Sequence, residues 1–460
     1  MASLKRITTL LWAVWLLFLF VGPVWGQKGG DDDDDDDDDD DKSTSPSVIF
    51  LTGTRTTPLT SIPSGVYKTY TSQITLASTS LGTDLGALTA NITDDDEATT
   101  SRTRTTLTGS VATTTGTANN NGTSTSTSTA TPTNTRPCNN YPELCARKYS
   151  NITQVGTHNS PFVRSGSAAA NQQFDVIAQL DDGVRFLQAQ IQWPTNGSVP
   201  HFCHTSCDLL DAGPITDWLR TVAEWVAEHP YDVVTILLGN GNYSNPDLYV
   251  PYIEESGITR FVYTPHVVPL RRDDWPTLGQ MILSGQRVVM FLDYVANQTA
   301  YPWLIDQFSH MWETPFDPTD PTFPCIVHRP PDLPPDAARD RLYLMNHNLN
   351  VEVSLLGQTV LVPAVSKLNE TNAVEGEGSL GSAAQNCTRD WGRPPNVLNV
   401  DYYNFGNYPG SVFEVAAKMN NVTWVRKPCC GSEKSGVGRL EERLAAVVIG
   451  LVFGFWMALS

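Results

Sequence analysis

The sequence predicts an α/β fold, a (β/α)8 barrel, over residues 138–427 of the 460-residue chain, and three observations support this prediction. From Cys138 to about Trp424, strand-like apolar runs alternate with amphipathic segments over roughly 290 residues, the usual size of one such barrel. Strands that are separated by helices pair in parallel. Polar residues also follow the ends of several runs, where the carboxyl ends of parallel strands would meet at one mouth.

Eight runs rich in apolar and β-branched residues give the expected strands. In chain order they are Ile152–Thr157, Val184–Ile191, Val199–Cys203, Val233–Leu238, Phe261–Tyr263, Val288–Leu292, Leu342–Met345 and Val397–Val400. Two intervening segments carry helix signals. The stretch "NQQFDVIAQLDDG" (171–183) ends on a glycine, and "PITDWLRTVAEWVAEHP" (214–230) begins with a proline and repeats apolar residues near helical spacing.

The segments on either side of the barrel lack the composition of a packed core. Residues 1–26 combine a basic start, the apolar stretch "LLWAVWLLFLFVG" and small residues, which is the pattern of a cleaved signal peptide. Residues 27–137 contain eleven consecutive aspartates (Asp31–Asp41) and a Ser/Thr-rich run, which predict a disordered, glycosylated stalk. Residues 428–460 place small residues and a polar spacer before an apolar tail, the layout of a glycosylphosphatidylinositol (GPI) attachment signal.

Charge and cysteine content narrow the class of protein further. The net charge is −19, but the aspartate run carries more than half of it, and no basic patch interleaved with aromatic residues indicates nucleic-acid binding. Eight cysteines in a secreted chain favour disulfides. The pairs that spacing suggests are Cys138 with Cys145, Cys203 with Cys207 and Cys325 with Cys387, and the partners of Cys429 and Cys430 are open.

Residues able to do chemistry gather where the apolar runs end. If the strands are parallel, these residues meet at the mouth of the barrel. They are Thr157-His158-Asn159, Gln188 to Gln192, His204, Gly239-Asn240, Asp293-Tyr294, Asn346-His347 and Asp401-Tyr402.

Six ordered motifs carry a family resemblance: "VGTHNSPF", "LDDGVRFLQAQIQ", "HFCHTSC", "HPYDVVTILLGN", "RVVMFLDY" and "NVLNVDYYN". Over about Asn151 to Tyr403 the chain resembles the catalytic X region of the phosphatidylinositol-specific phospholipase C superfamily of distorted TIM barrels. It is most similar to the GPI-anchored fungal branch, the PLC-like phosphodiesterases. The resemblance implies a distorted (β/α)8 TIM barrel that cleaves a phosphodiester.

The resemblance also implies a mechanism that uses two histidines. An attacking hydroxyl must lose a proton and the leaving alkoxide must gain one, and imidazoles serve both steps near neutral pH. His158 and His204 match the two family histidines, and His201 is a nearby rival for the second. The remaining polar residues at the mouth are expected to bind substrate, namely Asn159, Gln188, Gln190, Asn240, Asp293, His347 and Asp401.

The chain departs from the family pattern at the positions that hold a metal in Ca²⁺-dependent relatives. Gln188 and Gln190 stand where those relatives present two carboxylates, and Gly239-Asn240 stands where they present a glutamate. Ca²⁺ needs carboxylate charge to balance its own, which amides do not supply. We therefore assign no metal ligands and leave the cofactor open, including a different metal arrangement that uses Asp293 or Asp401. Arg185, on the second strand, is expected to point away from the lumen because it is an odd number of residues from Gln188.

Two hypotheses for function follow. The first is a GPI-anchored phosphoric diester hydrolase at the cell surface, acting on a phosphoinositide, a GPI glycan or a related phosphodiester through His158 and His204. The second is a barrel that lost its chemistry and binds lipid head groups or glycans at the cell surface, since neutral amides suit hydroxyl-rich ligands. The oligomeric state and the identity of the substrate are left open by the sequence.

Overall fold

The computed structural model describes residues 67–68, 70–76, 137–163, 167, 170–204, 206–355, 358–425 and 429–430, with the backbone alone for 353–360. All of these residues fall in one compact unit, Ile49–Ser460. The expected signal peptide and most of the expected anchor signal lie outside the described residues. Among the helices that are described, none combines the length and the apolar composition needed to cross a bilayer.

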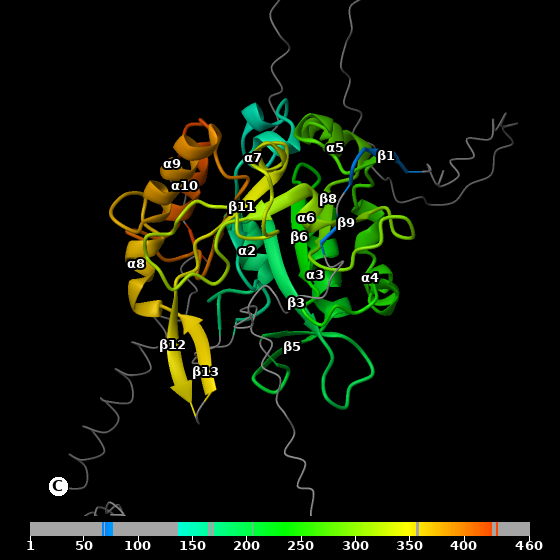
Figure 1. Ribbon diagram of the computed structural model, residues 1–460, viewed down its shortest axis with the longest axis horizontal. Helices are drawn as coiled ribbons and strands as arrows, with labels where there is room; N and C mark the ends of the chain where they lie inside the picture. Colours follow the sequence, from blue (N-terminus) through cyan, green and yellow to red (C-terminus); the bar gives the residue numbers. More distant parts are fainter. Residues whose placement is uncertain are drawn as a thin grey trace, which may run out of the picture. The chain divides into compact units, whose positions relative to one another are not determined.

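A curled sheet of eight parallel strands forms the centre of the fold (Figure 1), which confirms the predicted α/β barrel architecture. Its spatial order is β10-β11-β14-β2-β3-β6-β8-β9, so the first and last expected strands lie side by side. The strands are β2 (Gln154–Thr157), β3 (Phe186–Gln192), β6 (Val234–Gly239), β8 (Val288–Leu292), β9 (Leu304–Asp306), β10 (Met311–Glu313), β11 (Leu342–Asn346) and β14 (Val397–Val400).

Helices connect the strands and cover the outside of the sheet. Asp175 caps the first described helix by accepting a bond from Ala178 N at 2.9 Å, and Gly183 ends it with φ 118°. The apolar positions predicted for 214–230 are buried against the sheet. The helices are α2 (Val176–Asp182), α3 (Ile215–Glu228), α4 (Val250–Glu255), α5 (Leu278–Ser284), α6 (Gln307–His310), α7 (Pro335–Arg339), α8 (Leu368–Thr371), α9 (Leu380–Trp391) and α10 (Ser411–Met419), with 3-10 turns at Pro142–Leu144, Tyr149–Asn151, Pro246–Leu248, Ile258–Phe261, Arg272–Asp274 and Val365–Lys367.

Two of the eight expected strands are not barrel strands. The run Val199–Cys203 forms β4 (His201–His204), which pairs antiparallel with the far end of β3 and with β5 (Leu210–Pro214). A short apolar run does not reveal the direction of its partner, which is why the prediction was wrong. Phe261 ends a 3-10 turn, and Val262 makes only an isolated parallel bridge to Val288. Two three-residue strands, β9 and β10, take the missing places.

Alternating side chains divide the barrel strands into two faces. One buried cluster combines outward residues such as Ile236 and Met290 with helix residues such as Leu219. A second cluster contains the alternate residues, among them Phe291 and Leu344. On this second face, the residues nearest the carboxyl ends of the strands are mostly polar. The lumen is therefore apolar at its base and polar at its mouth.

The segment Tyr67–Leu76, apart from Thr69, departs from the disordered stalk that we expected over 27–137. Its strand β1 (Ile74–Thr75) pairs antiparallel with β7 (Val267–Val268). The Tyr67 ring packs edge-on against Tyr294 and Phe308, with ring centroids 5.8 and 5.0 Å away. The barrel thus has an additional ordered contact with the chain that precedes it.

A separate two-stranded ribbon and four disulfides complete the described structure. The strands β12 (Asn350–Leu355) and β13 (Gln358–Pro363) form an antiparallel hairpin that extends from the barrel (Figure 1). The disulfides Cys138–Cys145, Cys203–Cys207 and Cys325–Cys387 match the pairs that the sequence suggested. Cys429 and Cys430 pair with each other.

Candidate active site

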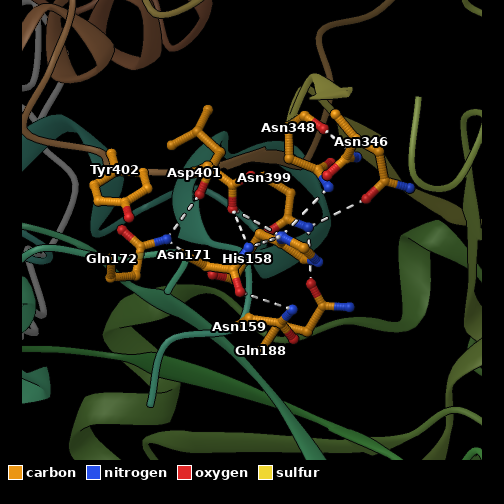
Figure 2. A network of polar contacts seen from close by, with 12 residues as sticks. His158, Asn159, Asn171, Gln172, Gln188, Asn346, Asn348, Asn399, Asp401 and Tyr402 are labelled. Carbon is orange, nitrogen blue, oxygen red and sulfur yellow. Dashed lines mark hydrogen bonds and ion pairs between the residues drawn. The ribbon is translucent and has the colours of Figure 1, made fainter. Parts of the chain in front are cut away.

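His158 occupies the carboxyl end of β2 and is held by Asp401 at the carboxyl end of β14. The register pairs Val400 with Thr157, so the next residue on each strand continues side by side. His158 Nδ1 lies 2.8 Å from Asp401 Oδ1 (Figure 2). Asn171 Nδ2 donates to the same carboxylate oxygen at 3.0 Å, which fixes its position.

The two residues are buried, and their proximity controls the charge of the imidazole. His158 is 3% and Asp401 2% exposed. Burial alone would lower the pKa of His158, but the Asp401 carboxylate, together with Asp317 and Glu313, raises the pKa above its ordinary value. With Nδ1 facing the carboxylate, the buried Nε2 is left without a hydrogen-bond partner among the described residues. A single imidazole nitrogen is therefore available for proton transfer.

A tight turn directly after β2 shapes the site. Asn159 has φ 50°, a left-handed conformation that asparagine tolerates better than most residues. Its Nδ2 donates to Asn171 Oδ1 at 3.2 Å, while its buried Oδ1 has no partner among the described residues. Gln172 Nε2 bridges the carbonyls of His158 and Val400 at 2.8 and 3.0 Å, which ties the turn to β14.

His204 contacts the same turn from the β4–β5 hairpin. It is 7% exposed, and its ring stacks on Phe162 with the ring centroids 5.1 Å apart. Phe162 N in turn donates to the Asn159 carbonyl at 2.9 Å. The turn His158–Phe162 thus touches both predicted histidines. The rival His201 faces the other strand of its hairpin, where its Nδ1 lies 2.8 Å from Asp211 Oδ2.

An amide chain crosses the lumen beside His158. Asn399 Nδ2 donates to Gln188 Oε1 at 2.9 Å and to Asn346 Oδ1 at 3.1 Å (Figure 2). The amides of Asn346 and Asn399 come from the neighbouring strands β11 and β14, and that of Gln188 comes from β3, on the other side of β2. Gln190 is two residues further along the lumen face of β3, beside Gly239 on β6. A Cβ added to Gly239 would lie 2.5 Å from Gln190 Oε1. Gln188 and Gln190 therefore both face the lumen, as the sequence predicted.

Two other expected substrate-binding residues bond within the protein, Asn240 through its whole amide and His347 through Nε2, while the buried His347 Nδ1 has no hydrogen-bond partner among the described residues. Asn240 donates to the carbonyls of Ser244 and Tyr294 and accepts from Ser244 N and the Tyr249 hydroxyl. His347 packs on the Phe323 ring, and its Nε2 lies 3.0 Å from the Thr371 carbonyl. Burial lowers the pKa of His347 to about 4, so it is neutral near pH 7. These two residues organise the loops around the mouth.

Asp293, at the end of β8, is 7% exposed. One of its carboxylate oxygens accepts from the backbone N–H groups of Asn240 and Tyr294 at 2.6 and 2.7 Å. Burial raises the pKa of Asp293 to about 7, although these two donors favour the charged form. The carboxyl group can therefore exchange a proton near neutral pH.

Sequence reasoning missed several residues at the mouth. Glu313 ends β10, is 1% exposed and pairs with Arg329, whose Nε lies 3.0 Å from its Oε2. Asn348 Nδ2 lies 3.3 Å from His158 Nδ1. Asn399 stands two residues before Asp401 on the same strand face, so the alternation rule would have found it. Glu313 ends a three-residue strand, and Arg329 and Asn348 lie in loops, so these residues leave no periodic signal.

The arrangement does not fit a Ca²⁺ site. In the part of the chain that the structure describes, the one group of three His, Cys, Asp or Glu ligand atoms at metal-binding spacing is Asp182 with Cys429 and Cys430, whose sulfurs form a disulfide. The unpartnered oxygens around His158 come from Asn159, Asn348, Asn399 and Asp401, which offer one carboxylate among them. Ca²⁺ sites need more negative charge than that. Arg185, as expected, is outside the site and pairs with Asp232 at 2.7 Å.

Comparison with known proteins identifies the family. The family model described as PI-PLC X 1 matches residues 144–420. An uncharacterized secreted protein of Arthroderma benhamiae is 53% identical over 319 residues, which cover 68% of this chain and 72% of that protein. A PI-PLC X domain-containing protein 1 of the same organism is 40% identical over 287 residues, 62% of this chain and 90% of that protein.

Among solved structures, the phosphatidylinositol-specific phospholipase C from Listeria monocytogenes matches with a TM-score of 0.40 and 12% identity. The match covers 61% of this chain and 98% of that chain. The family model spans more than half of the 460 residues and includes both His158 and Asp401. The chain is a member of the PI-PLC X family.

Proposed function

We propose that this protein is a phosphoric diester hydrolase of the phospholipase C type, acting on a phosphoinositide or a GPI-type phosphodiester. One observation carries the proposal. The buried His158 presents Nε2 without a protein partner while Asp401 holds Nδ1, at the carboxyl ends of the barrel strands. A carboxylate that orients a histidine and stabilises its protonated form is what a general base requires.

The proposed reaction begins when His158 Nε2 takes the proton from a hydroxyl of the head group. That hydroxyl oxygen attacks phosphorus and the bond from phosphorus to the lipid oxygen breaks. His204 gives a proton to the leaving oxygen. The products are a lipid alcohol and a phosphodiester, which is cyclic when the attacking hydroxyl belongs to the same head group. The positive charge that His158 gains is balanced by Asp401.

We assign binding of the head group to the polar lumen residues on either side of His158. Asn399, Gln188 and Gln190 offer uncharged donors and acceptors, which suit hydroxyl groups. Asp293 faces the same lumen from β8 and can accept a hydrogen bond from a hydroxyl group. Asn240 and His347 are left out of this set because the Asn240 amide and His347 Nε2 bond to the surrounding loops.

We also propose that the protein acts outside the cell, attached through a GPI anchor. The relative named as a secreted protein supports secretion. The expected signal sequences at the two ends of the chain support the anchor. The anchor, which directly follows the barrel, would then hold it within reach of lipids or GPI-linked proteins.

Turnover of radiolabelled phosphatidylinositol tests the proposal. The purified protein is assayed with Ca²⁺ and with a chelator, beside His158→Ala and His204→Ala. His229→Ala is the matched control, because His229 caps the carboxyl end of α3 and stacks on Trp225. We expect turnover that the two site substitutions lower by about a hundredfold or more and that the control preserves. Since the donor set does not fit Ca²⁺, the chelator should have no effect.

The alternative hypothesis, a head-group binding protein without chemistry, is favoured by the amides at Gln188 and Gln190. It predicts that the folded protein binds glycerophosphoinositol but cleaves neither phosphatidylinositol nor a GPI-linked substrate. If the wild-type protein is folded but cleaves neither substrate, the alternative hypothesis replaces the hydrolase.

A further inference from the structure

The amide chain in the lumen ends on a buried ion pair. Glu313 Oε2 accepts from Arg329 Nε at 3.0 Å and from Asn346 Nδ2 at 3.3 Å. The carbonyl of Thr314 also accepts from Asn346 Nδ2, at 3.2 Å. A carboxylate paired with arginine and a backbone carbonyl are both acceptors that donate nothing. They require Asn346 to turn its NH₂ group toward them.

This requirement passes from strand to strand. Because the NH₂ group of Asn346 faces Glu313 and Thr314, its Oδ1 faces Asn399, and Asn399 must present Nδ2 to it, at 3.1 Å. The same Nδ2 reaches Gln188 Oε1 at 2.9 Å. Each amide in the chain therefore has one orientation, although an isolated amide could be turned over at little cost.

Two polar atoms of the chain, Asn399 Oδ1 and Gln188 Nε2, are not used in its internal contacts. Asn399 Oδ1 is buried and has no partner among the described residues. It lies on the side of Gly156, 3.4 Å from where a Cβ on that glycine would be. Because Gln188 presents Oε1 to Asn399, its Nε2 is turned away from this contact. The chain thus places the Asn399 acceptor and the Gln188 NH₂ group at fixed orientations near His158 (Figure 2).

We propose that Asn346, held by Glu313 and the Thr314 carbonyl, is a positioning residue that sets the hydrogen-bond polarity of the substrate site through Asn399 and Gln188. The ligand that fits this polarity is a head group with neighbouring hydroxyls, one donating to Asn399 Oδ1 and one accepting from Gln188 Nε2. The inference rests on the proposed function for the identity of that ligand.

Asn346→Leu tests the relay without removing any group that touches substrate. The variant keeps the Glu313–Arg329 pair but leaves Asn399 and Gln188 free to turn over together, so that the donor and the acceptor exchange places in part of the molecules. Leu344→Val is the matched control, because it also alters a fully buried lumen side chain on β11, one layer deeper. On phosphatidylinositol we expect Asn346→Leu to raise KM about tenfold, the effect of one hydrogen bond, with kcat within about twofold. The control should leave KM unchanged.

A neutron structure of the wild-type protein provides the second measurement, because it shows the amide hydrogens. The relay requires hydrogens on the Asn399 nitrogen to point at Gln188 Oε1 and Asn346 Oδ1. A KM of Asn346→Leu equal to that of Leu344→Val would overturn the inference, and so would an Asn399 amide found in the opposite orientation. If wild type cleaves no phosphodiester, the proposed function fails, and the neutron structure alone then decides the relay. If Asn346→Leu does not fold, the neutron structure alone likewise decides the relay.

Discussion

His158 Nδ1 lies 2.8 Å from Asp401 Oδ1, although 243 residues separate them in the chain. The contact exists because β2 and β14 are neighbours in the curled sheet and both end at its mouth. It holds the pKa of a buried histidine above its ordinary value. The predictions below begin from this pair and move outward through the site.

Replacement of Asp401 by asparagine should move the pH dependence of catalysis. His158 acts as a base in its neutral form, so the wild-type rate should rise with pH through a midpoint above about 6.5, the ordinary histidine pKa. Without the carboxylate, burial lowers the pKa of His158 and the midpoint moves to lower pH. We also expect kcat to fall about a hundredfold as orientation is lost. A pH–rate profile with an unchanged midpoint in Asp401→Asn would show that His158 is not the titrating base.

Asp293→Asn should stabilise the protein increasingly as pH rises. The folded-state pKa of Asp293, about 7, lies above its ordinary value of 3.8, so the folded state binds this proton more tightly than the unfolded state. The stability that it contributes is complete below about pH 4 and is lost as pH rises toward 7. The variant does not titrate and should gain about 2–4 kcal/mol over wild type across this range.

Urea unfolding at about pH 4 and about pH 8 measures this difference. Asp273→Asn is the control, because the Asp273 side chain is 96% exposed. A pH-independent difference between Asp293→Asn and wild type would contradict the raised pKa.

Gly239→Ala should affect substrate more than stability. The added Cβ would lie 2.5 Å from Gln190 Oε1, the far end of a flexible side chain that can move aside. We expect an unfolding free energy within about 1 kcal/mol of wild type and a higher KM, because Gln190 leaves its place in the lumen. Gly381→Ala is a matched contrast, since its Cβ would lie 1.7 Å from the rigid Val374 carbonyl. Gly381→Ala should lose stability and keep its KM. If instead Gly239→Ala loses stability and keeps its KM, the assignment of Gln190 is refuted.

The ordered segment before the barrel should contribute to its stability. Tyr67→Ala removes a ring that packs on Tyr294 and Phe308, and we expect the unfolding free energy to fall by about 1–3 kcal/mol. Ile74→Ala on the same segment is the control, because Ile74 is 53% exposed and should matter little. Equal stability of Tyr67→Ala and wild type would mean that this segment does not dock in solution.

Much of the fold could be predicted because the longer strands carry uninterrupted apolar runs. Val234–Gly239 and Val288–Leu292 were located within a residue or two for this reason. Leu304–Asp306 and Met311–Glu313 are too short to show a period. The run at Val199–Cys203 was read as a parallel strand, whereas it turns back on β3, since direction depends on the turn between them and not on the strand itself.

The site was predictable where it follows strand ends and unpredictable where it depends on spatial neighbours. His158 and Asp401 each follow an apolar run, but their pairing requires the first and last expected strands to be adjacent. Arg329 reaches Glu313 across an irregular segment that has no periodic pattern. Asn240 is occupied by hydrogen bonds from Tyr249 and Ser244, and no spacing rule in the sequence reveals these contacts.

The central claim is that His158 initiates cleavage of a phosphodiester, and phosphorus NMR of the reaction tests it most directly. Phosphatidylinositol is incubated with wild type and with His158→Asn, which keeps a polar side chain of similar reach, after circular dichroism has shown that both are folded. We predict that wild type converts the lipid signal into that of a cyclic phosphodiester and that His158→Asn leaves it unchanged. Equal conversion by both proteins, or a folded wild type that leaves the lipid intact, would contradict the account.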